Sequence, residues 1–170
     1  GLEDTGASDG TTFLIRQLFY NVPARRKFLK TPITEASHVG DLMTRLALSH
    51  PEISFQFINN GQSRLHTSGN GNLKDVIYHV YGREITANLI PLEYKNNGLS
   101  LSGYIGAPLI SRGNRNFENY FINGRYVKSN IIYRAIEDAY KDFSMQHKFP
   151  FTVFHITIDG EHVDVNVHPT

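Results

Sequence analysis

Residues 117–143 read FENYFINGRYVKSNIIYRAIEDAYKDF, and this stretch combines the two kinds of secondary structure that decide the fold. FENYFI (117–122) predicts a strand, and Asn123-Gly124 predicts a tight turn. A helix is expected from about Ser129 to Gln146, because apolar side chains recur on one helical face. These side chains are Ile131, Ile132, Ala135, Ile136, Ala139 and Phe143.

Strands and helices continue to alternate on both sides of this stretch. Hairpins are expected over residues 53–67, 89–105 and 151–167, with Asn60-Gly61 as a type I′ turn in the first. One helix is expected from Thr31 or Thr34 to His50 and another from Asn72 to a stop at Gly82. The apolar face of the first would consist of Val39, Leu42, Met43, Leu46 and Ala47. The mixture predicts an α+β fold, with a sheet and helices packed mainly on one face.

The N-terminal part carries a cluster of positive charge. TTFLIRQLF (11–19) is rich in β-branched and aromatic residues and predicts a buried strand. Asn21 and Pro23 then predict the cap and first turn of a short helix. The next cations are Arg25, Arg26 and Lys27. Positive charge at a helix start is disfavoured by ~0.3–1 kcal/mol, so a negative partner is expected.

Length and composition limit the possibilities. The 170 residues suffice for one domain with a real core, and the net charge of +1 means that any nucleic-acid affinity must come from local clustering. The chain has no cysteine, which removes disulfides and cysteine metal sites. No apolar run approaches the ~20 residues of a membrane span, and no signal peptide opens the chain. Both ends read as interrupted, since the chain stops at VNVHPT within an expected strand.

A second basic stretch lies between residues 112 and 134. Its cations are Arg112, Arg115, Arg125, Lys128 and Arg134, interleaved with Phe117, Tyr120, Phe121 and Tyr126. The Asn123-Gly124 turn would project Arg125 from a hairpin end, where it can meet a phosphate backbone. The alternative is that the aromatics are ordinary core residues of a strand and the cations a solvated surface.

Motifs of common enzyme classes do not occur. The eight histidines show no HExxH spacing and no cluster with carboxylates, so no metal site is expected. Neither a G-x-S-x-G elbow nor a G-x-x-x-x-G-K-[ST] loop is present. By itself the chain does not read as an enzyme, and no catalytic residue is assigned.

Three strings resemble the MutL family of DNA mismatch-repair proteins: GTTFLIRQLFYNVPARRKFL (10–29), FINGRYVKS (121–129) and VDVNVHP (163–169). The resemblance implies an N-terminal ATPase of the GHKL type, shared with gyrase B and Hsp90, followed by a transducer domain. That transducer has a ribosomal protein S5 domain 2-like fold. Residues 1–22 would be a loop and the last strand of the ATPase domain, and residues 23–170 a transducer that lacks its C-terminal end.

The resemblance also implies roles for particular residues. Thr11 would help to hold the nucleotide, and Asn166 lies in a motif associated with ATP-dependent function. Arg125 and Lys128, together with Arg112 and Arg115, would contact DNA. The Arg25, Arg26 and Lys27 cluster would meet either DNA phosphates or acids at the junction with the ATPase domain. ATP and Mg²⁺ are expected in the longer parent protein and not as tight ligands of this chain, which alone would be inactive.

The implied function is to couple ATP binding and hydrolysis in the neighbouring domain to DNA binding and to signalling in mismatch repair. Expected partners are DNA, the upstream ATPase domain, a homodimer partner and a MutS-type mismatch-recognition protein, in the bacterial cytoplasm and with no membrane. Three rival interpretations remain open. They are a transducer of another GHKL protein such as a gyrase B-like one, a free-standing S5-like nucleic-acid-binding module, and a purely structural interaction domain.

Overall fold

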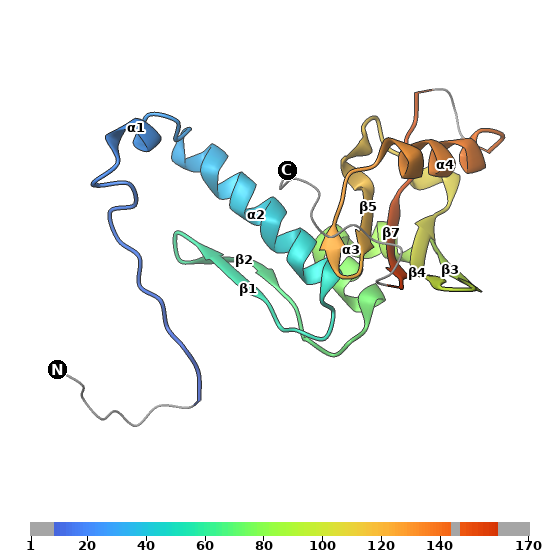
Figure 1. Ribbon diagram of the computed structural model, residues 1–170, viewed down its shortest axis with the longest axis horizontal. Helices are drawn as coiled ribbons and strands as arrows, with labels where there is room; N and C mark the ends of the chain where they lie inside the picture. The colour runs from blue at the N-terminus through green and yellow to red at the C-terminus, as the bar shows by residue number, and fades with distance from the viewer. Residues whose placement is uncertain (1–8, 144–146, 160–170) are drawn as a thin grey trace. The chain divides into compact units, whose positions relative to one another are not determined.

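The computed structural model describes residues 9–143 and 147–159 (Figure 1). The chain divides into two compact units, Gly1–Glu35 and Ala36–Thr170, here called the N-terminal and C-terminal units. The second half of the predicted last hairpin, HVDVNV (162–167), lies outside the described residues.

In the described part of the N-terminal unit, α1 (Pro23–Arg26) is a short helix that precedes the start of α2 at Pro32. It begins at a proline, as predicted, but its N-cap is Val22, which has no side-chain hydrogen bond, so the prediction of Asn21 as the cap was wrong. The helix is only four residues long, and Arg25 and Arg26 therefore fall in its last turn. A helix of a single turn has only a small macrodipole, so the expected penalty for positive charge at its start is small.

The buried strand predicted over residues 11–19 does not form. This segment has no regular secondary structure, and Phe13, Leu14 and Ile15 are 84%, 74% and 75% exposed. A strand requires backbone partners on a neighbouring strand. The described residues of this unit offer none, so strand propensity alone leaves the segment unpaired.

Helix α2 (Pro32–Ser49) has nearly the predicted bounds. At its start the Thr31 hydroxyl accepts a hydrogen bond from the Thr34 backbone N–H, with 3.3 Å between N and Oγ1. Its predicted apolar face is only partly buried, because Ala47 is buried and Met43 packs at the core edge while Leu42 is 54% exposed.

The C-terminal unit contains the hairpin of β1 (Gln56–Asn59) and β2 (Gln62–His66). Its turn residues Asn60 and Gly61 have φ of 51° and 74°, as a type I′ turn requires. This hairpin was predicted correctly.

Helix α3 (Leu73–Ala87) follows, and the Asn72 side chain caps it by accepting from the backbone of Lys74 and Asp75. The predicted stop at Gly82 is instead a kink. Gly82 has φ 83° and ψ −179°, and a further helical turn continues to Ala87.

Five strands form one mixed sheet in the order β3-β4-β7-β5-β6. Their bounds are β3 (Leu89–Asn96), β4 (Leu99–Gly106), β5 (Glu118–Ile122), β6 (Arg125–Tyr126) and β7 (Thr152–Ile158). All neighbouring pairs are antiparallel except β5 and β7, which are parallel. Two short 3₁₀ turns, Pro108–Ile110 and Arg115–Phe117, interrupt the loop between β4 and β5. Helix α4 (Asn130–Tyr140) makes the crossover from β6 to β7, and it is shorter than predicted.

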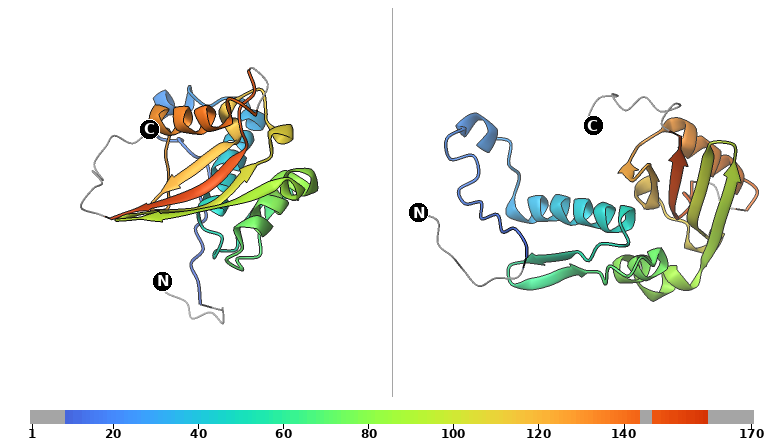
Figure 2. Two further views of the ribbon diagram at one scale, coloured as in Figure 1. Left: turned by 90° about the vertical axis from the view of Figure 1, so that its right-hand side faces the viewer. Right: turned by 60° about the horizontal axis from the view of Figure 1, so that its bottom comes forward.

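Helices cover both faces of the sheet. On one face Phe121 and Val153 pack against the end of α2 and against α3, with Ala47, Leu48, Val76 and Ile77. On the other face Tyr120, Phe154 and Ile156 pack against α4. The left view of Figure 2 shows α4 (orange) and α3 (green) on opposite sides of the strands. Of the helices that pack against the sheet, α2 and α3 share one face and α4 covers the other, and the predicted α+β class with a mixed sheet is confirmed.

Candidate nucleic-acid interface

The turn between β5 and β6 presents Arg125 at a fixed position. Asn123 and Gly124 have φ of 48° and 78°, which closes a tight two-residue turn. Arg125 follows it and is exposed. The prediction that the Asn123-Gly124 turn exposes Arg125 at a hairpin end is therefore confirmed, which concerns its position and not a ligand.

Asn123 also fastens this turn to the end of β7. Its side-chain amide donates to the Ile158 carbonyl and accepts from the Ile158 N–H, both at 3.0 Å. Its backbone N–H donates to the Ile156 carbonyl at 2.9 Å. The Asn123 side chain therefore extends the hydrogen bonding between the turn and β7. Arg125 follows a turn that these bonds hold to β7.

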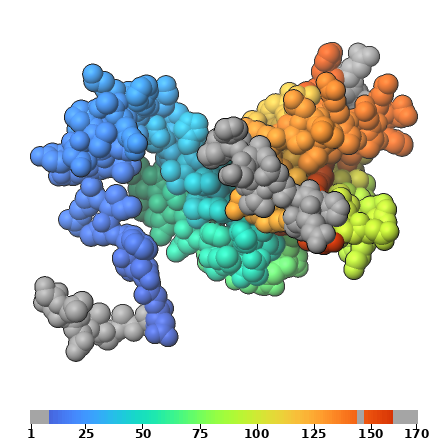
Figure 3. Space-filling model, viewed as in Figure 1, coloured from blue at the N-terminus to red at the C-terminus, as the bar shows by residue number. Residues whose placement is uncertain are grey.

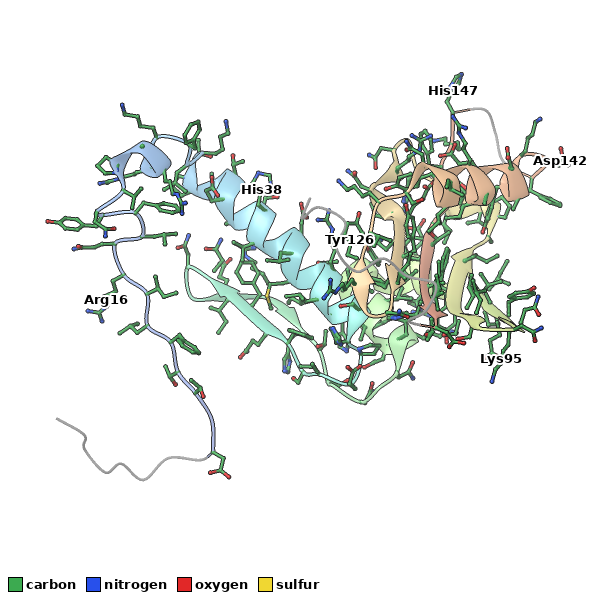
Figure 4. The ribbon with its side chains drawn as sticks, viewed as in Figure 1. Arg16, His38, Lys95, Tyr126, Asp142 and His147 are labelled. Atoms are coloured by element: carbon green, nitrogen blue, oxygen red, sulfur yellow. The ribbon has the colours of Figure 1, made fainter. Side chains whose placement is uncertain are left out.

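Tyr126 joins this turn to helix α2. The guanidinium carbon of Arg45 lies 4.4 Å from the centroid of the Tyr126 ring, and both side chains are half-buried. Tyr126 is labelled in Figure 4. Burial raises the pKa of Tyr126, while the nearby charges of Arg45 and Lys128 act in the opposite direction. Lys128 itself is exposed. A cation from α2 therefore lies against this ring, while Lys128 follows two residues later in the chain.

His155 connects the same helix to the centre of the sheet. Its Nε2 lies 3.0 Å from the Leu48 carbonyl oxygen, so this nitrogen donates, and its ring stacks on Phe121 with centroids 5.1 Å apart. Burial lowers the pKa of His155. This neutral histidine fixes the C-terminal end of α2 against β7.

Arg115 has a different environment from Arg125. Its Nε donates to Glu137 Oε1 at 2.5 Å and its terminal nitrogen to Oε2 at 3.1 Å. The guanidinium also lies 5.4 Å from the Tyr133 ring and 5.0 Å from the Phe149 ring. This paired geometry fixes Arg115 to α4, so Arg115 is less available to an external phosphate than Arg125.

Arg112 is half-buried in the loop before β5. Its backbone exchanges two hydrogen bonds of 2.8 Å with Phe149, and its guanidinium lies 5.6 Å from the Phe117 ring. Its Nε is buried without a hydrogen-bond partner in the described part of the chain. The structure does not bring Arg112 or Arg115 together with Arg125 and Lys128 into one contact network.

The remaining predicted site residues fall in the N-terminal unit or outside the described residues. Arg25, Arg26 and Lys27 are all exposed, and over residues 9–143 and 147–159 none of them forms a salt bridge. Thr11 is also exposed. Asn166 lies outside the described residues.

Sequence reasoning missed Arg45, Asn123 and His155. Arg45 lies 81 positions before Tyr126, and no local pattern links two residues so far apart. Asn123 was assigned to the turn, but its bonds to Ile158 follow only from the sheet order. The histidine count gave no signal for His155, because its role depends on the packing of α2.

Two further features are absent from the part of the chain that the structure describes. No group of three or more histidine, aspartate or glutamate side chains is arranged to hold a metal ion there. No described helix has the length and apolar character needed to cross a membrane.

Comparison with protein families matches residues 77–170 to the family described as DNA mismatch repair protein, C-terminal domain. The DNA mismatch repair protein MutL of Agathobacter rectalis is 63% identical over 99% of the chain, and that of Clostridium botulinum strain Eklund 17B is 47% identical over 98%. The chain covers 26% and 25% of these two proteins, so it spans about a quarter of their length.

Solved structures share the fold. The N-terminal domain of a DNA repair protein superposes with a TM-score of 0.71 at 21% identity, over 90% of this chain and 51% of that one. The MutL ATPase domain of Aquifex aeolicus complexed with ADP superposes with a TM-score of 0.62 at 25% identity, over 85% of this chain and 51% of that one. The expected S5-like fold agrees with these neighbours.

Proposed function

Because the chain belongs to the MutL family of DNA mismatch repair proteins, we propose that it contains the transducer domain, which couples an adjoining ATPase domain to DNA. The observation that carries the proposal is the β5–β6 turn, where exposed Arg125 precedes exposed Lys128 on a backbone fastened to β7. Fixed cations on a rigid turn suit contacts to a phosphate backbone, which do not depend on base sequence.

The fastening of the turn supports the coupling part of the proposal. Ile158, which holds Asn123, is the last residue of β7, and the chain then continues into the segment that carries Asn166. A change of position in that segment has a short covalent path to Ile158 and from there to the turn before Arg125. Nucleotide state and DNA contact are therefore linked, in this proposal, through β7.

The exposed apolar side chains of the N-terminal unit support a domain junction. Phe13, Leu14, Ile15 and Phe28 are exposed, and large apolar side chains gathered in one segment mark an interaction surface. We propose that Phe13, Leu14 and Ile15 belong to the last strand of the ATPase domain and are covered by the rest of that domain in the longer protein. Arg25, Arg26 and Lys27 would then meet acids at the junction between the two domains.

Cofactors and further partners belong to the longer protein in this proposal. ATP with Mg²⁺ would bind mainly to residues outside this chain, with Thr11 and Asn166 as contributors. A second MutL-type subunit, a MutS-type protein and DNA are the proposed partners, in the cytoplasm. The family match favours this proposal over a gyrase B-like transducer.

Fluorescence anisotropy with a labelled duplex across a salt series tests the DNA proposal. The chain with Arg125→Glu and Lys128→Glu is compared with a control that carries Lys74→Glu and Arg83→Glu, two exposed cations of α3. Both double variants change the net charge by the same amount. A loss of DNA binding in the Arg125/Lys128 variant alone therefore indicates a contact at that position and not general repulsion.

We expect salt-sensitive binding in the wild-type chain and in the control, and at least about tenfold weaker binding in the Arg125/Lys128 variant. Equal weakening in both variants would show that only net charge matters and would contradict a site at the turn. Unchanged binding in the Arg125/Lys128 variant would move the contact to another cation cluster.

A further inference from the structure

A pocket of about 660 Å³ lies on the face of the sheet that α2 and α3 cover. Its floor is formed by residues of β3, β4 and β7, and β3 is the edge strand opposite β6. Its walls are the segment after α2, with Pro51 and Glu52, and the segment before α3, residues 70–72. The pocket is therefore a different site from the β5–β6 turn.

The floor combines an apolar row and a polar row of side chains. In the register of the sheet Pro91 is opposite Tyr104, and both line the pocket. In the next row Glu93 is opposite Ser102, and Ser102 is opposite His155. Residues two apart along a strand point to the same face, so the two rows lie side by side on one surface.

His155 contributes a hydrogen-bond acceptor to the polar row. Its Nε2 donates to the Leu48 carbonyl oxygen at 3.0 Å, and burial lowers its pKa, so the ring is neutral. In a neutral imidazole whose Nε2 carries the proton, Nδ1 is an acceptor. The hydroxyl of Ser102, next to His155 in the row, can accept as well.

The charged side chains at the pocket are both negative. Glu52 and Glu93 are exposed carboxylates, and no described residue that lines the pocket is a lysine or an arginine. Over the described residues Glu93 forms no salt bridge, and Glu52 pairs only with His50, through Oε1 at 3.0 Å. A cation that enters the pocket therefore meets carboxylate oxygens that are free to bind it.

The N-terminus of α3 does not turn this pocket into an anion site. The Asn72 side chain accepts hydrogen bonds from the backbone N–H groups of Lys74 and Asp75, so these amides already have a partner. Asp75 also places a negative charge in the first turn of the helix, which offsets its dipole. An anion would thus meet two carboxylates and capped amides, and the pocket favours a positive ligand.

From this geometry we propose that the pocket binds the arginine side chain of a partner polypeptide. The alkyl stem of the arginine would lie along Pro91 and Tyr104, as long cationic side chains do on apolar surfaces. The guanidinium would donate to the carboxylates of Glu52 and Glu93. Its planar fork carries more N–H donors than an ammonium, which suits acceptors that come from several elements.

Titration of the isotope-labelled chain with N-acetyl-arginine amide, followed by nuclear magnetic resonance, tests this inference. We expect saturable shifts of the amide signals of Ser102 and Gly103, which line the pocket, and of the ring signals of His155. N-acetyl-citrulline amide has nearly the same shape without the charge and should produce no saturable shift. N-acetyl-lysine amide should bind more weakly than the arginine compound, because it lacks the fork.

Three variants locate the binding. Glu52→Gln and Glu93→Gln should each weaken binding of the arginine compound about two- to fivefold, as loss of one exposed ion pair does. Both carboxylates are exposed, so these changes leave the core intact. Glu84→Gln removes an exposed carboxylate of α3 outside the pocket and should bind like the wild-type chain.

The contrary outcomes are equally specific. Absence of a saturable shift in the wild-type chain, or equal shifts with the citrulline compound, would overturn the inference. An equal loss of affinity in Glu84→Gln would overturn it by showing a diffuse attraction to negative charge. Because the titration contains no DNA, a failure here leaves the proposed function standing, and the two can be judged separately.

Discussion

Glu118 carries a carboxyl group that the fold buries without a partner. Its side chain is 1% exposed, and neither oxygen has a hydrogen-bond partner within the described residues. Burial, and then repulsion by Glu137, raise its pKa to about 7, and Arg115 offsets only part of this. The Arg115 guanidinium is bound to Glu137, which explains why it does not neutralise Glu118.

This carboxyl group should make stability depend on pH. Between pH 4.5, the ordinary pKa, and about 7 the folded chain keeps a proton that the unfolded chain has released. The free energy of unfolding therefore falls as pH rises through this window, by at most about 3 kcal/mol. In Glu118→Gln this loss should vanish, as urea unfolding at pH 5 and pH 8 would measure.

Glu93, an exposed carboxylate on β3, provides the matched control. Glu93→Gln should keep the wild-type difference between the two pH values. The same pH dependence in Glu118→Gln as in wild type would mean that Glu118 is ionised in the folded chain.

The side chain of Asn123 should contribute measurably to the stability of the β5–β6 turn. Asn123→Gly keeps the left-handed backbone conformation and removes both side-chain bonds to Ile158. We expect a loss of about 1–2 kcal/mol and faster hydrogen exchange at the Ile158 amide. Unchanged exchange at that amide would contradict the fastening of the turn to β7.

At the scale of elements, two glycines with positive φ would respond differently to an added side chain. Gly82 in α3 has φ 83°, and an added Cβ would meet nothing within 4 Å. Gly103 in β4 has φ 144°, and its Cβ would lie 2.4 Å from the Val153 carbonyl oxygen. Of these two glycines, only Gly103 combines an unfavourable φ for other residues with a steric clash against β7.

Gly82→Ala should therefore cost about 1–2 kcal/mol of unfolding free energy, and Gly103→Ala about 3 kcal/mol or more. Chemical denaturation of the two variants measures the difference. A Gly103→Ala chain as stable as Gly82→Ala would mean that β4 and β7 separate at little cost.

Local sequence patterns predicted the hairpins correctly where the turn requires particular residue types. Asn60-Gly61 and Asn123-Gly124 marked their hairpins because both turns need residues that accept positive φ. The strand over 11–19 failed because a strand depends on a partner that local propensity does not encode. The helix predicted to reach Gln146 ends at Tyr140, since a periodic apolar pattern continues beyond the last packed turn.

At the scale of the whole molecule, the order of the strands determines which candidate residues meet. The sequence identified Arg125 and Lys128, but the contact of Arg45 with Tyr126, between them, emerged only from the packing of α2 beside β6. In Figure 3 the outer side of α4 (orange) is open to solvent, and Ile131 and Arg134 on it are exposed. This helix carries the acid that binds Arg115, so its surface is not a continuous cationic face.

Mapping of the DNA contact by nuclear magnetic resonance tests the central claim most directly. Amide signals of the isotope-labelled chain are followed while a short duplex is added at low salt. We predict that signals from residues 123–129 shift, with those of α3 around Arg83 unaffected. Shifts confined to residues 23–30, or none in residues 123–129, would contradict a DNA surface at the β6 edge.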